Sequence, residues 1–221
     1  MKLSFFPKLA LDGIRKNRRL FLPYILSGAG LVTMTYILFF LSSSEMLGHM
    51  KGGGVLGYML PIGIVVVSVF AVIFMFYTNS FIIRQRCREF GLYNVLGMDK
   101  HNLGRLMLWE NLIAACLSIG PGLLAGILLS KFAELGMVNL LQETVSYTLY
   151  IDFGSVGRTA LLFLGIFALL LINSVVKVRK SDPLELLRSE NVGEKAPKAN
   201  WVTTGIGIIL LGAAYYIALS I

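Results

Sequence analysis

The side chains that could do chemistry in this sequence are few and lie far apart. The two histidines, His49 and His101, have no acidic or cysteine neighbours at the spacing of metal ligands. The two cysteines, Cys87 and Cys116, fall in a basic stretch and in an apolar one, so we expect no disulfide and interpret both as packing residues. The sequence therefore predicts no nucleophile, no metal site, no cofactor and no enzyme.

Two kinds of energy coupling are also excluded by residue type. No Gly-x-x-x-x-Gly-Lys-Ser/Thr loop occurs, so the chain does not bind ATP in that manner. An ion-driven transporter needs ionisable groups deep in its spans, yet Glu110 stands only at the start of an apolar segment. Asn79, Asn111 and Asn173 are uncharged and are predicted to hydrogen-bond between helices. Any driving energy is expected from another protein.

The elements that position these residues are membrane spans. Apolar residues make up 56% of the chain and charged residues 14%. A helix of about 20 apolar residues crosses a hydrocarbon core of roughly 30 Å. Five segments have that length, at about 20–41, 60–83, 108–130, 159–176 and 202–221. The sequence therefore predicts an all-α, polytopic transmembrane helical bundle with about five spans.

The positive charges indicate how the spans are oriented. All but three of the 20 Lys and Arg residues lie before the first span, between the second and third, or between the fourth and fifth. The exceptions are Lys51, Lys131 and Arg158. This asymmetry predicts a cytoplasmic N-terminus. It also accounts for the net charge of +8 without nucleic-acid binding.

The segments between the spans add local detail. Residues 1–19 mix apolar and basic positions and predict a short helix on the inner membrane face. Residues 84–98 are predicted to be helical with two apolar strips: Leu92, Val95 and Leu96 on one side, Phe90 and Tyr93 on the other. We expect one strip to pack on the chain's own spans and the other on a partner. Gly97 is expected to end that helix.

Small residues mark the third span and a capping signal follows the fourth. Gly120, Pro121, Gly122 and Gly126 predict a bend and a close helix contact, with a gating hinge as the alternative to simple packing. After the fourth span, Ser181 or Asp182 is expected to cap a helix with Pro183 in its first turn. Residues 189–200 are interpreted as a linker.

Two of these segments resemble a known family. The sequence RQRCREFGL at 84–92, with LGM at 96–98 and then Lys100 and Glu110, resembles the Arg-Glu-Ile-Gly-Leu, Leu-Gly and later Glu pattern of FtsX-like permeases of ABC transporters. The sequence DPLELL at 182–187 resembles the exit segment Asp-Pro-x-Glu-x-Leu of the same module. The loop after the first span has only 16 residues, 42–57, and in this the chain is similar to the bacitracin-export (BceB-like) type.

The resemblance implies a coupling helix and a set of partners. The helix would rest against a separate ABC ATPase subunit through Arg84, Arg86, Arg88, Glu89, Phe90, Gly91, Leu92, Leu96 and Gly97. Structural roles are expected for Glu110, Gly120, Pro121, Gly122, Gly126, Asp182 and Pro183. Further expected partners are the lipid bilayer, a sensor histidine kinase, and a peptide antibiotic or its complex with a lipid-linked cell-wall precursor.

The predicted organisation and function follow from the same resemblance. We expect a basic helix, first span and short loop over 1–57, a permease module over 58–188, and a linker with a fifth span over 189–221. Such permeases are expected to lie in the bacterial cell membrane and to have ten spans, so the chain is interpreted as truncated. The predicted function is that of a permease subunit for antimicrobial-peptide resistance or sensing. The alternative is a non-transporting scaffold that regulates cell-wall hydrolases or division.

Overall fold

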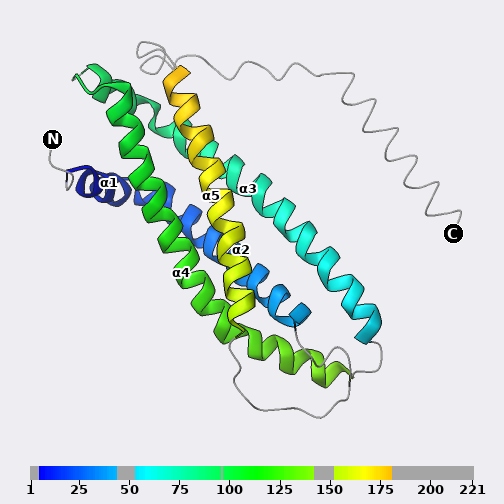
Figure 1. The fold of residues 1–221 in the computed structure, drawn as a ribbon. Helices are drawn as coiled ribbons and strands as arrows, with labels where there is room; N and C mark the ends of the chain where they lie inside the picture. Colours follow the sequence, from blue (N-terminus) through cyan, green and yellow to red (C-terminus); the bar gives the residue numbers. More distant parts are fainter. Residues whose placement is uncertain (1–4, 44–52, 96, 142–151, 181–221) are drawn as a thin grey trace, which may run out of the picture.

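The structure, a computed structural model, describes residues 5–43, 53–95, 97–141 and 152–180. Within these ranges the regular elements are all helices, as Figure 1 shows: α1 (Phe5–Lys16), α2 (Arg18–Ser43), α3 (Gly53–Val95), α4 (Lys100–Leu141) and α5 (Phe153–Lys180). The all-α prediction is confirmed. The predicted fifth span, 202–221, and the segment with Asp182 and Pro183 lie outside the described residues.

Four of the helices are long and apolar enough to cross a membrane, over Arg18–Ser43, Gly54–Cys87, His101–Ala133 and Phe153–Val178. They contain the first four predicted segments, so the prediction of helices with the length and apolar character of membrane spans is confirmed for these four. The helices are longer than predicted, because backbone hydrogen bonding continues into polar sequence beyond the apolar stretch. Helix α3 has 43 residues and is therefore about 65 Å long at 1.5 Å per residue, roughly twice the hydrocarbon thickness.

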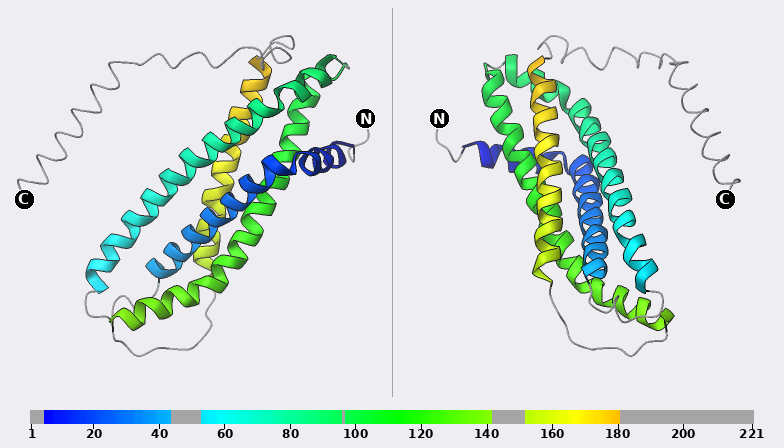
Figure 2. Two further views of the ribbon diagram at one scale, coloured as in Figure 1. Left: turned by 180° about the vertical axis from the view of Figure 1, so that it is seen from behind. Right: turned by 45° about the vertical axis from the view of Figure 1, so that its right-hand side comes forward.

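The spans run side by side with alternating direction (Figures 1 and 2). The start of α2, the end of α3, the start of α4 and the end of α5 lie toward the same end of the bundle, and α1 crosses it there at a steep angle. We call this the basic end, defined as residues 5–21, 83–95, 97–110 and 174–180. The C-terminal part of α4 turns aside at the opposite end.

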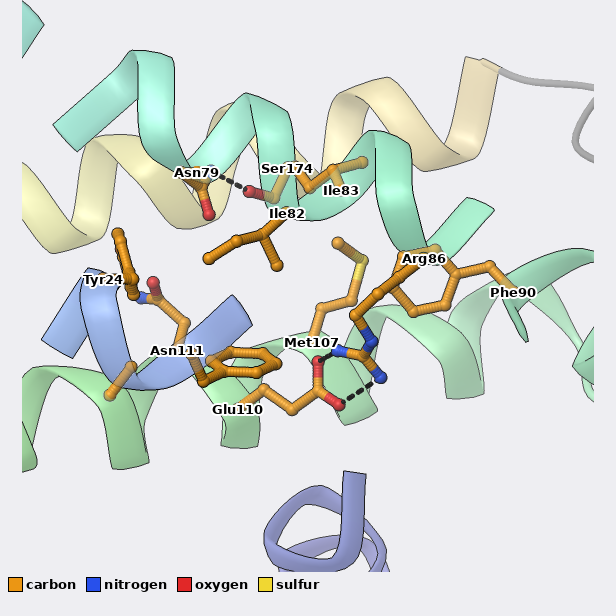
Figure 3. A pocket seen from close by; sticks show the side chains of 12 residues that line it. Tyr24, Asn79, Ile82, Ile83, Arg86, Phe90, Met107, Glu110, Asn111 and Ser174 are labelled. Atoms are coloured by element: carbon orange, nitrogen blue, oxygen red, sulfur yellow. Dashed lines mark hydrogen bonds and ion pairs between the residues drawn. The ribbon is translucent and has the colours of Figure 1, made fainter. Parts of the chain in front are cut away.

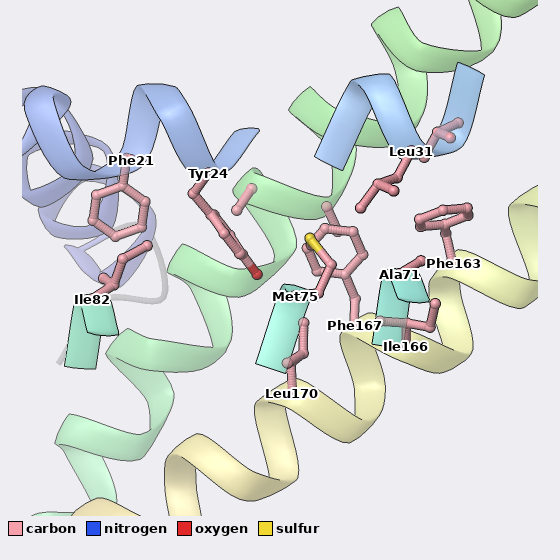
Figure 4. Packing of buried hydrophobic residues seen from close by; sticks show 13 residues of the cluster. Phe21, Tyr24, Leu31, Ala71, Met75, Ile82, Phe163, Ile166, Phe167 and Leu170 are labelled. Carbon is pink, nitrogen blue, oxygen red and sulfur yellow. The ribbon is translucent and has the colours of Figure 1, made fainter. Parts of the chain in front are cut away.

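The core between the spans is built from one face of each helix (Figure 4). Helix α5 contributes Phe163, Phe167 and Leu170, whose spacing of three and four residues places them on a single stripe. Tyr24 of α2 meets Phe167 edge to face, with ring centroids 6.3 Å apart. Helix α3 turns one face toward this core. Its other face is apolar and exposed, as expected of a surface that contacts lipid.

Helices α2 and α4 come into close contact at two glycines of α4. A Cβ atom on Gly122 would lie 2.7 Å from Val32 Cβ, and one on Gly126 would lie 2.8 Å from the Tyr36 ring. This closeness lets the Thr33 hydroxyl donate to the Gly122 carbonyl oxygen at 2.9 Å. The predicted close contact at these two glycines is confirmed, whereas Gly120 faces open space.

The N-terminal helix α1 packs with one face on helices α3 and α4. Helix α1 buries Phe6 and Ala10, four residues apart, in a second cluster with Phe90 of α3 and Leu103 of α4. Asn17 separates α1 from α2, and its carbonyl oxygen accepts the first backbone hydrogen bonds of α2. The predicted membrane-surface helix is therefore docked on the basic end of the bundle.

Candidate coupling surface

The last turns of α3 carry two faces of opposite character. Ile82, Arg86 and Phe90 follow one another at intervals of four residues and are all buried. On the other side, Leu92 is 52% exposed and Val95 66% exposed. The predicted division of this helix into a strip toward the chain and a strip away from it is confirmed for these residues.

An ion pair with two parallel hydrogen bonds connects α3 to α4 at the centre of the basic end (Figure 3). Arg86 is only 2% exposed. Its Nη1 donates to Glu110 Oε2 at 2.6 Å, and its Nη2 donates to Glu110 Oε1 at 2.9 Å. This bidentate geometry is the strongest that an arginine and a carboxylate can make, and it fixes the two helices in register.

A second carboxylate extends the ion pair to the junction of α1 and α2. Arg86 Nε donates to Glu89 Oε2 at 3.0 Å. The Asn17 amide donates to both oxygens of Glu89, at 3.0 and 3.1 Å. The backbone of α1 passes directly over the pair at Gly13, because a Cβ atom there would lie 2.9 Å from Glu110 Oε1. Helices α1, α2, α3 and α4 therefore meet around one guanidinium.

Aromatic rings complete the surroundings of this charge. The guanidinium carbon of Arg86 lies 5.4 Å from the Phe21 ring centroid and 5.0 Å from the Phe90 centroid. Each is within the range of a cation–π contact, which strengthens when the cation is shielded from water. The cavity beside the pair has a volume of about 40 Å³, enough for a few waters and far too small for a peptide.

The Glu89 carboxylate is the part of this network that pH can reach, because its side chain is 27% exposed. Burial opposes its ionisation, but the hydrogen bond from Asn17 and the charge of Arg86 outweigh burial and lower the pKa of Glu89 below its usual value. Stability from a lowered pKa is complete above the unfolded-state value, about 4.3 for Glu, and is lost as the pH falls through the folded-state value.

Acid is therefore expected to weaken the link between α3 and the α1–α2 junction. Thermal midpoints of the purified protein and of Glu89→Gln, measured from pH 7 to pH 3, are expected to differ most at neutral pH and to converge as the pH falls below about 4. The difference between the curves isolates Glu89, since other carboxylates titrate in both proteins. Parallel curves would show that the ionised form of Glu89 contributes nothing.

The structure distributes the predicted coupling residues between the inside and the outside of the bundle. Arg86, Phe90 and Gly91 are buried, and Glu89 is half-buried. Arg84, Leu92 and Gly97 are exposed.

The end of α3 lies where it was predicted. Gly97 has a φ of 91°, and the Met98 amide donates to the Tyr93 carbonyl oxygen at 2.9 Å, so the predicted helix end is confirmed. The side chain of Arg88 and residue 96 lie outside the described set. Contact of these residues with an ATPase stays a prediction.

The predicted structural residues that the structure describes have different surroundings. Glu110 forms the ion pair with Arg86, and Gly122 and Gly126 leave room for the close approach of α2. Gly120 and Pro121 are exposed on α4.

Two of the asparagines hydrogen-bond between helices as predicted: Asn79 donates to the Ser174 hydroxyl and Asn111 donates to the Phe167 carbonyl oxygen.

Sequence reasoning missed the residues that close this network from the N-terminal side, which are Gly13, Asn17 and Phe21. Asn17 carried a usable signal, because an asparagine between a basic helix and an apolar span is a typical helix N-cap. Gly13 and Phe21 carried none that separates them from other small and aromatic residues of the chain. The packing interpretation of the cysteines holds for half-buried Cys87, whereas Cys116 is exposed.

The described side chains of this site connect helices through one network of ion pairs and hydrogen bonds. Among the described residues, no three His, Cys, Asp or Glu side chains lie close enough to hold a metal ion. The fold and the site define a helical membrane protein in which a span continues, without interruption, into a helix with an exposed apolar strip. Comparison with known families agrees with this class, because residues 61–183 match the family described as FtsX-like permease C-terminal. The chain belongs to the FtsX-like permease family.

Similar proteins are permeases of ABC transporters from Bacillus subtilis (strain 168). The chain is 28% identical over 213 residues to the uncharacterized ABC transporter permease YvcS, and 25% identical over 219 residues to the bacitracin export permease protein BceB. It is 26% identical over 213 residues to the ABC transporter permease protein YxdM. These matches cover 95–96% of this chain and 33–34% of each relative, so the chain spans about a third of the length of the relatives it matches.

Proposed function

We propose that this chain is the membrane part of an ABC transporter in which α3 transmits the movement of a separate ATPase subunit to the spans. The continuity of α3 supports this proposal most directly: a single helix, Gly53–Val95, joins a span to the exposed strip at the basic end. A continuous helix of this kind moves as a rigid element, so displacement of its end displaces the span.

The surface offered to the ATPase in this proposal is the outer strip of α3. Leu92 and Val95 would supply apolar area, since burying one such side chain contributes about 1.5–3 kcal/mol. Arg84 is exposed two turns earlier on the same helix and would set register and association rate through charge. In this proposal Arg86 and Glu89 do not contact the ATPase. They hold the end of α3 on the bundle, so that its displacement moves the spans.

The handled substrate is proposed from the relatives. Similarity to a bacitracin export permease supports a role in resistance to, or sensing of, peptides that attack the cell wall. A peptide antibiotic, or its complex with a lipid-linked precursor, would then be the substrate, and a sensor histidine kinase a further partner. The short connection between α2 and α3, residues 44–52, favours this over the scaffold role, which is expected to use an external domain there.

The test is to break the outer strip without disturbing the buried one. The double variant Leu92→Asp, Val95→Asp, made in the full-length protein and coexpressed with its ATPase, is expected to lower affinity for the ATPase at least about 30-fold, because truncating a buried interface anchor costs about 2 kcal/mol. Co-purification measures the complex, and growth in bacitracin measures the output.

The matched control is Leu11→Asp on α1, because Leu11 is 52% exposed, as Leu92 is, and lies at the same end. It is expected to leave the complex intact. Normal co-purification and normal ATP hydrolysis in the double variant would refute the proposed surface. Loss of the complex with unchanged bacitracin sensitivity would keep the surface and refute the substrate.

A further inference from the structure

A groove on the outside of the bundle lies between the basic ends of α4 and α5, away from the Arg86 network. Its volume is about 320 Å³, at the lower end of the roughly 300–1,000 Å³ of small-molecule sites. Gly104 lines the groove opposite α5: a Cβ atom there would have only Val175 Cγ1 within 4 Å, at 3.8 Å. The walls are the aliphatic side chains of Leu108, Ile172 and Val176.

The groove is apolar along its length and cationic at one end. Arg105 and His101 line its end toward the start of α4, and both are exposed. None of its described lining residues is acidic. The apolar segment predicted for α4 begins at about Leu108, so the groove lies at the predicted membrane boundary on the basic side. An aliphatic slot with a cation at the water interface matches an acyl chain with an anionic headgroup.

We propose that this groove binds one anionic phospholipid, with an acyl chain along Leu108, Ile172 and Val176 and the phosphate at Arg105 and His101. A partner helix fits the lining less well, because the lining residues include no aromatic anchor of the kind that dominates protein interfaces. The basic end also faces the leaflet that is predicted to be cytoplasmic, and anionic lipid collects there. The lipid would couple the ends of α4 and α5 at the level of the ion pair.

The experiment labels the full-length protein in vesicles with phosphatidylglycerol or phosphatidylcholine that carries a photoactivatable acyl chain. Adducts are then mapped by peptide mass spectrometry. We expect phosphatidylglycerol to label 101–108 and 171–176 about fivefold more than phosphatidylcholine, the ratio that one cation near the surface provides. Residues 161–164, nearer the middle of α5, are expected to be labelled equally by both lipids.

Two variants and their controls separate a site from general attraction. Arg105→Gln is expected to abolish the preference in the groove, whereas Arg19→Gln, an exposed cation of α2 at the same end, is expected to retain it. Gly104→Leu fills the groove and is expected to lower labelling by both lipids, whereas Gly165→Leu on open α5 surface is not. Equal labelling by the two lipids in the wild type would overturn the proposal. A preference that survives Arg105→Gln, or protection of the groove from both lipids by a protein, would do so as well.

Discussion

Glu110→Ala is expected to lower the free energy of unfolding by about 3–5 kcal/mol, because it leaves the Arg86 guanidinium buried without its counter-charge. Arg86 is 2% exposed and Glu110 supplies both acceptors for its Nη atoms, so Glu89 alone cannot replace it. For a chain of this length the thermal midpoint is expected to fall by about 6–20 °C. Thermal unfolding in detergent, followed by circular dichroism, measures the shift.

The double variant Arg86→Met, Glu110→Leu is the decisive comparison. It removes both charges and keeps similar volume, so most of the lost stability is expected to return. Glu110→Gln is the intermediate case, because the amide keeps one acceptor oxygen for the guanidinium. If Glu110→Ala were as stable as the wild type, or if the double variant were no more stable than Glu110→Ala, the pair would not be what holds α3 against α4.

A stable double variant would also separate stability from function. The proposed role of Arg86 and Glu89 is to keep the end of α3 attached to α1, α2 and α4 while an ATPase moves it. An apolar pair can replace the packing of Arg86 and Glu110, but it cannot reproduce the directed hydrogen bonds that fix the register of the helices. Under the proposed coupling role, we therefore expect the double variant in the full-length protein to assemble with the ATPase and to give less bacitracin resistance per ATP hydrolysed.

The spans were predictable because the bilayer imposes a length that the sequence must supply. A run of about 20 apolar residues is visible without knowledge of any contact, and the alternation of Lys and Arg between loops indicates the side. The ends of α3 and α4 were not predictable in this way. Both helices continue well past their apolar segments, to Val95 and Leu141, since a helix end is set by caps and packing rather than by hydropathy.

Only part of the ion-pair network around Arg86 could be predicted from the sequence. Glu110 was expected to be structural, but the sequence analysis did not say which of the nearby arginines, Arg84, Arg86 or Arg88, pairs with it. The phase of α3 decides, because Arg86 lies four residues from both Ile82 and Phe90 and thus on the buried stripe. That stripe can be read from the sequence. The contribution of Asn17 and Gly13 cannot, since it depends on how α1 folds back over α3 and α4.

The glycines of α4 carry the other large expected effect. Gly122→Ala is expected to destabilise the bundle by about 1–3 kcal/mol, because the added Cβ would meet Val32 Cβ at 2.7 Å and the Ala29 carbonyl oxygen at 2.8 Å. Neither atom is the free end of a side chain, so α2 and α4 must separate, and the Thr33 hydrogen bond to Gly122 lengthens. Gly122→Ala with Gly126→Ala is expected to cost more than either change alone, since Gly126 meets the buried Tyr36 ring in the same way.

Gly120→Ala is the matched control, because it adds the same methyl group to the same helix with no atom within 4 Å. Alanine is a better helix former than glycine by about 1 kcal/mol, so Gly120→Ala is expected to be neutral or slightly stabilising. The opposite sign of the two substitutions, measured as thermal midpoints in one detergent, separates close packing from helix propensity. Equal stability of Gly120→Ala and Gly122→Ala would mean that α2 and α4 are not in close contact, and the helix arrangement around Arg86 would then have to be revised.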